Sequence, residues 1–196
     1  MATVSRVYDT YAQARSAVMD LEAKGIAPSE ISLVANKYVS KDLDDVDDVS
    51  KTAAGAGIGA ALGGGAGLLA GLGLLAIPGL GPVVAAGWLA ATAVGAAAGA
   101  ATGGVVGALV GAGEPEEHAH VYAESIRRGG TLVTVRTTDT EVASVRAILD
   151  RHQPIDPQTR GADYRRAGWT AFDPKAPPYR PTESEIERIR ARSLGL

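Results

Sequence analysis

A chain of 196 residues is long enough for one or two small domains, and its formal charge of −3 and pI near 5.6 provide no basic surface for nucleic acid. The chain contains no cysteine, which excludes disulfides and thiolate metal sites. Residues Met1 to Arg6 lack the basic region, apolar core and cleavage site of a secretory signal, so we expect no export by that route.

The N-terminal part predicts a strand, a helix and a second strand. Thr3 to Tyr8 is rich in β-branched and aromatic residues, and Thr10 with Gln13 forms a capping-box pattern for the following helix. Gly25 stands where a helix would end, and Ile31 to Ala35 is apolar enough for a strand covered on both faces. We expect a right-handed βαβ unit.

Residues 37–52 change character to a mixture of lysines and five aspartates. Carboxylate oxygens could bind a cation, but the run lacks the glycine turn and terminal glutamate of the calcium-binding EF-hand loop. We therefore interpret this segment as a solvated acidic linker.

An uncharged stretch of about sixty residues follows, from Thr52 to Gly113, with glycine at every fourth position on both sides of a central break. Such a glycine row lines one side of a helix and lets another helix approach closely. We predict a helical hairpin over residues 53–113, with a turn at Pro78, Gly79, Gly81 and Pro82. The predicted packing glycines are Gly55, Gly59, Gly63, Gly67, Gly71, Gly95, Gly99, Gly103, Gly107 and Gly111.

Glycine limits how such helices can exist. Each one costs roughly 1 kcal/mol relative to alanine inside a helix, so these helices need close packing in lipid or in an oligomer. The halves 53–77 and 82–112 are each long enough for a bilayer core of about 30 Å.

Residues 114–153 predict a second helix, strand and helix. Pro115 begins the first helix, Thr131 to Thr137 forms a strand, and Thr138 with Glu141 gives a capping box for the second helix. Together with residues 1–36 these elements predict an α/β fold. It is a small three-stranded sandwich of βαβ plus αβα, interrupted by a long Gly/Ala-rich hydrophobic helical hairpin.

Residues 154–196 form a proline-rich tail with spaced aromatic residues and a short final helix from Thr182. The aromatic side chains are expected to anchor the tail to a surface, either as a strap between subunits or on the same subunit. These anchors are Tyr164, Trp169, Phe172 and Tyr179.

No catalytic motif is recognisable. The run Gly55 to Ala60 matches a loose dinucleotide pattern but follows no strand, and no acidic residue for a ribose occurs about twenty residues later. His118 and His120 lie two apart, about 200° around a helix, so both cannot easily face one ion. His152 stands alone at a helix end. We expect no enzyme activity, cofactor, metal or small-molecule substrate.

The segments Val7 to Thr10, Ile31 to Ala35 and Gly130 to Val135 resemble the opening and closing halves of the bacterial general stress protein family with the heat-induced, 17M-like domain. Related low-temperature-induced and stress proteins often carry a glycine-zipper hairpin between such halves. The resemblance covers residues 3 to 152. It implies a stress-associated protein and offers no active-site residues to transfer.

Two functions follow as hypotheses. In the first, a non-catalytic stress protein is anchored by its hairpin on the cytoplasmic side of the inner membrane and oligomerises through it. Low apolar driving force from Gly and Ala, and acidic flanks that oppose the positive-inside preference, weaken this hypothesis. In the second, a cytoplasmic homo-oligomer buries the zippers of many subunits in its core. Two successive uncharged stretches of spanning length are uncommon in water-soluble domains, and they favour the first hypothesis over the second.

Overall fold

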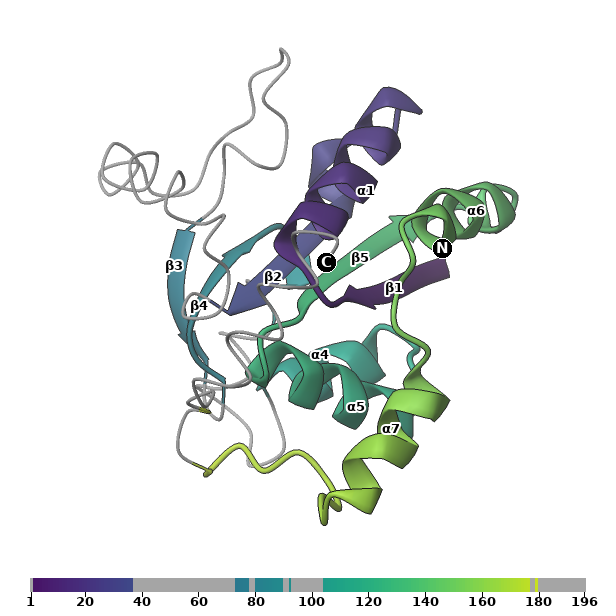
Figure 1. Ribbon diagram of the computed structural model, residues 1–196. Helices are drawn as coiled ribbons and strands as arrows, with labels where there is room; N and C mark the ends of the chain where they lie inside the picture. The colour runs from purple at the N-terminus through teal and green to yellow at the C-terminus, as the bar shows by residue number, and fades with distance from the viewer. Residues whose placement is uncertain are drawn as a thin grey trace.

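The computed structural model describes residues 2–36, 73–77, 80–89, 92, 104–176 and 179. Their centre is a five-stranded sheet in which every neighbouring pair of strands is antiparallel, in the order β1-β5-β2-β4-β3 (Figure 1). The strands are β1 (Ala2–Tyr8), β2 (Ile31–Asn36), β3 (Gly73–Ile77), β4 (Gly81–Ala86) and β5 (Thr131–Thr137).

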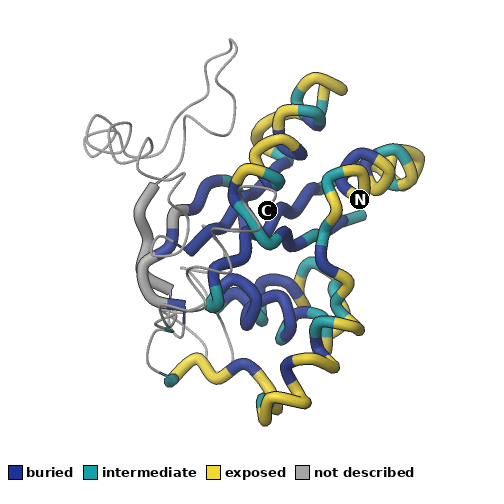
Figure 2. Tube along the Cα trace, viewed as in Figure 1, coloured by how far each residue is buried: buried dark blue, intermediate teal, exposed yellow. Residues whose placement is uncertain are grey.

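Helices cover both faces of this sheet (Figure 1). One face carries α1 (Tyr11–Ala23) and α6 (Val142–Arg151), and the other carries α4 (Gly104–Gly111) and α5 (Glu116–Arg127). A fifth helix, α7 (Pro157–Arg166), packs on α5, and a short 3₁₀ helix (Pro28–Glu30) precedes β2. Figure 2 shows the buried residues along the strands and the inner sides of the helices, so the sheet separates two apolar cores.

The predicted first strand, helix and second strand are all present. Thr10 caps α1, and its hydroxyl oxygen accepts a hydrogen bond from the Gln13 backbone N–H at 3.2 Å. Every residue of β2 is buried, as its apolar sequence predicts for a strand covered on both faces. However, β5 lies between β1 and β2, so the α1 crossover joins two parallel strands that are not neighbours.

The uncharged stretch differs from the prediction. Residues 73–77 and 81–86 form strands rather than parts of two helices, so the sheet has five strands instead of three. Val83 and Ala85 are buried in the core under α4 and α5, and β4 pairs with β2. The β-branched valines of β4 favour a pleated, half-buried surface, and pairing with β2 satisfies the backbone.

The predicted turn also joins different elements. The connection after Ile77 links β3 to β4, with Ile77 opposite Gly81, and thus makes a β-hairpin rather than a helical hairpin. Gly81 and Pro82 lie inside β4, and Pro82 is accommodated next to the strand's first residue, just beyond the register of β2. Pro78 and Gly79 lie outside the described residues.

The helices α4, α5 and α6 agree only in part with the predicted helices. Pro115 is the N-cap of α5, and α4 confirms the helical prediction for residues 104–111. Thr138 and Glu141 form no capping box: the Thr138 hydroxyl donates to the Glu141 carboxylate at 3.0 Å, and α6 begins only after Glu141. The predicted final helix from Thr182 lies outside the described residues.

The tail contains a helix, α7, that was not predicted. Asp156 caps α7 by accepting a hydrogen bond from the Thr159 N–H at 2.7 Å, and Pro157 occupies the first turn. Proline is tolerated at that position because its missing N–H would have no partner inside the helix. The Asp-Pro pair is thus a start signal, not a stop signal.

A pair of neighbouring residues tests whether α4 belongs to the domain core. Leu109 is completely buried and Val110 is 41% exposed. We expect Leu109→Ala to lower the free energy of unfolding by about 3 kcal/mol, because it leaves a cavity. Val110→Ala should change it by less than about 1 kcal/mol. Urea unfolding followed by circular dichroism measures both, and equal effects would contradict the placement of α4.

Candidate functional site

The predicted packing glycines are mostly outside the part of the chain that the structure describes. Only Gly107 and Gly111 are described, and both belong to α4. Gly111 is exposed, and a Cβ atom built on it would meet nothing within 4 Å. The groove at Gly111 is therefore not filled by the described residues. The eight others are Gly55, Gly59, Gly63, Gly67, Gly71, Gly95, Gly99 and Gly103.

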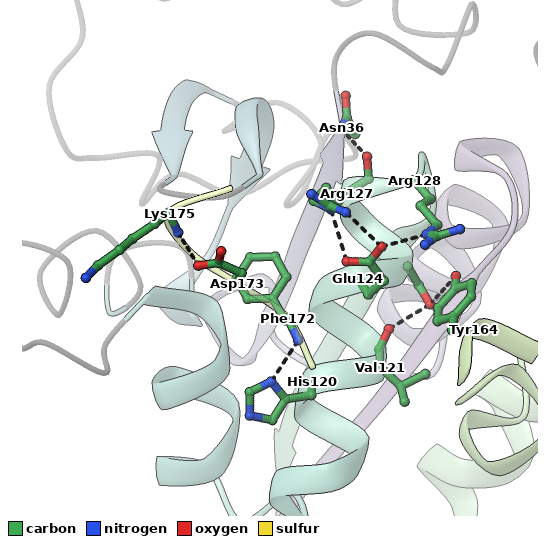
Figure 3. Close-up of polar contacts among 11 residues, drawn as sticks. Asn36, His120, Val121, Glu124, Arg127, Arg128, Tyr164, Phe172, Asp173 and Lys175 are labelled. Atoms are coloured by element: carbon green, nitrogen blue, oxygen red, sulfur yellow. Dashed lines mark hydrogen bonds and ion pairs between the residues drawn. The ribbon is translucent and has the colours of Figure 1, made fainter. Parts of the chain in front are cut away.

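The four aromatic residues of the tail lie near α5 of the same chain. Tyr164 and Phe172 are buried, and Trp169 packs edge-on against Tyr164 with ring centroids 5.7 Å apart. The Phe172 backbone N–H donates to His120 Nδ1 at 3.2 Å, as Figure 3 shows. Tyr179 lies beside the guanidinium groups at the end of α5. In this arrangement the tail packs back on its own subunit.

A buried carboxylate organises the contact between α5 and the tail (Figure 3). Glu124 is 1% exposed and accepts hydrogen bonds from Arg127 Nε at 3.0 Å and from Arg128 Nε at 2.6 Å. The Arg128 guanidinium stacks over the Tyr164 ring, 4.5 Å from its centroid. The Tyr164 hydroxyl is in turn 3.1 Å from the Ser125 hydroxyl. These polar groups satisfy one another, so we assign them a structural role.

A hollow of about 510 Å³ lies beside the exposed edge of β1. Its walls come from β1, the loop before α5, the first turns of α5, the outer side of α6 and the segment that leads into α7. The lining residues are Thr3, Val4, Arg6, Gly113, Glu114, Pro115, His118, Tyr122, Arg146, Asp150, Pro154, Ile155, Asp156 and Pro157.

The edge of β1 is covered on one side of this hollow. The Ile155 N–H donates to the Val7 carbonyl at 2.8 Å, and Arg6 Nη1 donates to the Ser5 carbonyl at 2.8 Å. Arg6 Nε also donates to Asp150 at 2.7 Å, across 144 positions of sequence. These contacts block strand addition there and fix the Arg6 side chain in the wall.

Tyr122 is the buried polar group of the hollow. It is 2% exposed, and burial raises the pKa of its phenol to about 12, with the charge of Glu114 adding to the rise and that of Arg6 opposing it. Burial lowers the pKa of Arg6, but the hydrogen bond and charge of Asp150 outweigh it and hold this pKa above its usual value. Opposite charges thus act on Tyr122 from two sides.

Sequence reasoning did not single out Arg6, Glu114 or Tyr122. The only local signal for this hollow is that Arg6 is the one charged residue of the N-terminal strand. Asp150 and Glu114 join Arg6 only through the order of strands and helices. The convergence of these side chains in one hollow makes it a candidate binding site.

The histidines are separated in space. His118 lines the hollow, His120 contacts the tail, and His152 Nε2 lies 3.0 Å from the Asp20 carboxylate. Among the described residues, no cluster of histidine and acidic side chains could hold a metal ion. Over the same residues, none of the helices has both the length and the apolar character needed to cross a membrane.

Comparison with known proteins gave no relative. No protein-family model, curated protein or solved structure matches the chain.

Proposed function

We propose that this is a non-catalytic, stress-associated protein that assembles with copies of itself through the glycine-rich segment between β2 and β3. The observation that carries the proposal is the division of the uncharged stretch. Its later parts form β3, β4 and α4 and contribute to the sheet and its core. Residues Thr52 to Leu72, which precede β3 in the sequence, contain five zipper glycines and no charge, and we assign the contacts between copies to them.

The attachment of this segment supports assembly rather than membrane crossing. Asn36 ends β2 opposite Val83, and Gly73 begins β3 opposite Ala85, so the two ends are two strands and two residues apart. Strand spacing makes that separation about 10 Å across the sheet. Because β2 and β3 run parallel, the chain leaves β2 towards one end of the sheet and enters β3 from the other end. Both strands nevertheless belong to one sheet, so any passage of the segment through a bilayer would need two crossings.

The length of the segment does not suit two crossings. A spanning helix needs about 20 apolar residues. The 36 residues between Asn36 and Gly73 include eight charged ones, all before Thr52, which leaves enough uncharged chain for only one crossing. The membrane-anchored hairpin is thus the weaker hypothesis, and the self-assembled oligomer is the stronger one.

Glycine spacing supplies the means of association. In a helix the five glycines from Gly55 to Gly71 make a groove without side chains, and backbones can approach closely along it. Such a helix is costly in isolation, by roughly 1 kcal/mol for each glycine, so it gains stability only in close contact with other helices. The resemblance of the flanking halves to general stress proteins supports the stress association.

Sizing of matched variants tests this function. The protein is prepared without detergent, floated on a lipid gradient, and its non-floating fraction is sized by sedimentation equilibrium. We expect a lipid-free particle several times the chain mass of 19.9 kDa. Gly63→Leu should reduce it towards the monomer, because a side chain fills the groove.

Ala61→Leu serves as the control, since this position lies about 200° from Gly63 around a helix and places the same side chain outside the groove. It should leave the particle intact. Flotation of the wild-type protein with lipid, resistant to high salt, would overturn the proposal in favour of a membrane anchor. A protein that neither floats with lipid nor forms more than a monomer at any concentration would overturn both the self-assembly proposal and the membrane anchor.

A further inference from the structure

The hollow beside β1 is lined by several charged side chains, of which some are paired with one another and some are not. Arg6 and Asp150 pair with each other, and Asp156 caps α7. Two further charged side chains line the same hollow, the exposed Arg146 from α6 and the half-buried Glu114 from the loop before α5. In the described part of the chain, neither Arg146 nor Glu114 forms an ion pair.

These two side chains carry opposite charges and reach the hollow from different elements. Arg146 lies one helical turn before Asp150 on α6, and it therefore adds a positive charge to the wall in which Arg6 and Asp150 pair. Glu114 acts on Tyr122 from the side of α5, where Asp156 adds a second carboxylate. The buried Tyr122 lies within the electrostatic influence of both sides.

We propose that this hollow binds a small zwitterion of the free amino acid class. The ligand's carboxylate lies toward Arg146, and its ammonium group lies toward Glu114. The buried Tyr122 phenol lines the hollow between these groups and is hydrogen-bonded to Arg6. A volume of about 510 Å³ accommodates an amino acid together with water.

The charge balance distinguishes this ligand from simpler ones. The Arg6–Asp150 pair is internally balanced, so a lone anion would meet the carboxylates of Glu114 and Asp156, and a lone cation would meet Arg146. Each would therefore face repulsion from one wall, while a zwitterion pairs with both. Charge-assisted hydrogen bonds on both sides are the strong kind, and they fix the orientation of the ligand.

The first experiment screens the common amino acids against the full-length protein by their effect on the midpoint of thermal unfolding. Binding to the folded state alone raises this midpoint. For the amino acid with the largest effect, calorimetry then measures Kd against its two matched analogues, one lacking the amino group and one lacking the carboxylate. We expect each analogue to bind at least about tenfold more weakly.

Substitutions locate the site. Glu114→Gln and Arg146→Gln should each raise Kd by about tenfold or more. The controls are Glu116→Gln in the first turn of α5 and Arg151→Gln in the last turn of α6, both exposed and both outside the hollow. They should leave Kd within about twofold, since surface charges away from the contact contribute little.

Three results would overturn the inference. These are no stabilisation by any amino acid, equal binding of an analogue that lacks one charge, and equal weakening by the control substitutions. All these readouts are independent of particle size, so failure of this inference is distinct from failure of the self-assembly proposal.

Discussion

Replacing Gly87 by alanine should lower the free energy of unfolding by about 3 to 4 kcal/mol. A Cβ atom at this position would lie 2.3 Å from the Ile31 carbonyl oxygen and 2.7 Å from the Ser32 Cα, both in the backbone of β2. The φ angle of +89° adds a conformational cost of about 1 to 2 kcal/mol, and forcing atoms into packed backbone adds about 1 to 3 kcal/mol. Urea unfolding followed by circular dichroism measures the sum.

Gly25→Ala is the matched control for this prediction. Gly25 has a similar φ angle of +94°, but a Cβ atom there would meet nothing within 4 Å. Only the conformational cost applies, so we expect a loss of about 1 kcal/mol. Equal losses at the two positions would contradict the close passage of the chain after β4 against β2.

Removal of the Glu124 side chain should have the second largest effect. Glu124→Ala leaves Arg127 and Arg128 without the carboxylate that both hydrogen-bond, and it leaves a buried space in α5. Breaking a buried pair costs about 3 to 5 kcal/mol, and we expect about 3 kcal/mol because both guanidinium groups are partly exposed. Urea unfolding is again the measurement.

The same substitution should loosen the tail. Arg128 stacks on Tyr164, which packs against Trp169, so the fluorescence of Trp169 reports the contact in a Trp88→Phe background. Glu124→Ala should shift this emission to longer wavelength, and Glu116→Gln, at an exposed position of the same helix, should leave it unchanged. An unchanged spectrum in Glu124→Ala would show that the ion pairs do not hold the tail.

Local patterns predicted the elements whose start and stop signals agree with their packing. Thr10 and Gln13 marked the start of α1, and continuous apolar residues marked β2 as covered on both faces. The mixed α/β character follows from such elements, whereas the antiparallel pairing of neighbouring strands was not predicted. The strand order does not, because pairing of β1 with β5 rather than β2 depends on contacts across more than 100 positions.

The uncharged stretch was harder to predict because glycine spacing and valine content favour different structures. Four-residue glycine spacing predicts a helical groove, and it took precedence over the short apolar runs of β3 and β4. Only the presence of β2 beside β4 decides between them, since pairing satisfies the backbone of Val83 and buries its side chain. This is tertiary context overriding a local pattern.

The hollow could not be predicted at all from linear spacing. Arg6, Glu114 and Arg146 come from three elements, and none belongs to a recognisable motif. Their proximity follows from α6 and the loop before α5 meeting at the β1 edge. Arg6, the single charged residue of the N-terminal strand, would have been the one clue to look there.

The central claim is that β4 belongs to the domain core while residues 55–71 make the contacts between copies. Hydrogen exchange measured by mass spectrometry tests this claim most directly. The assembled wild-type particle and the Gly63→Leu variant are compared. We predict that β4 (Gly81–Ala86) is as protected as β5 in both, and that residues 55–71 lose protection only in the variant. Joint loss of protection over β4 and residues 55–71 in the variant would contradict this division, because it would show that both belong to one zipper hairpin.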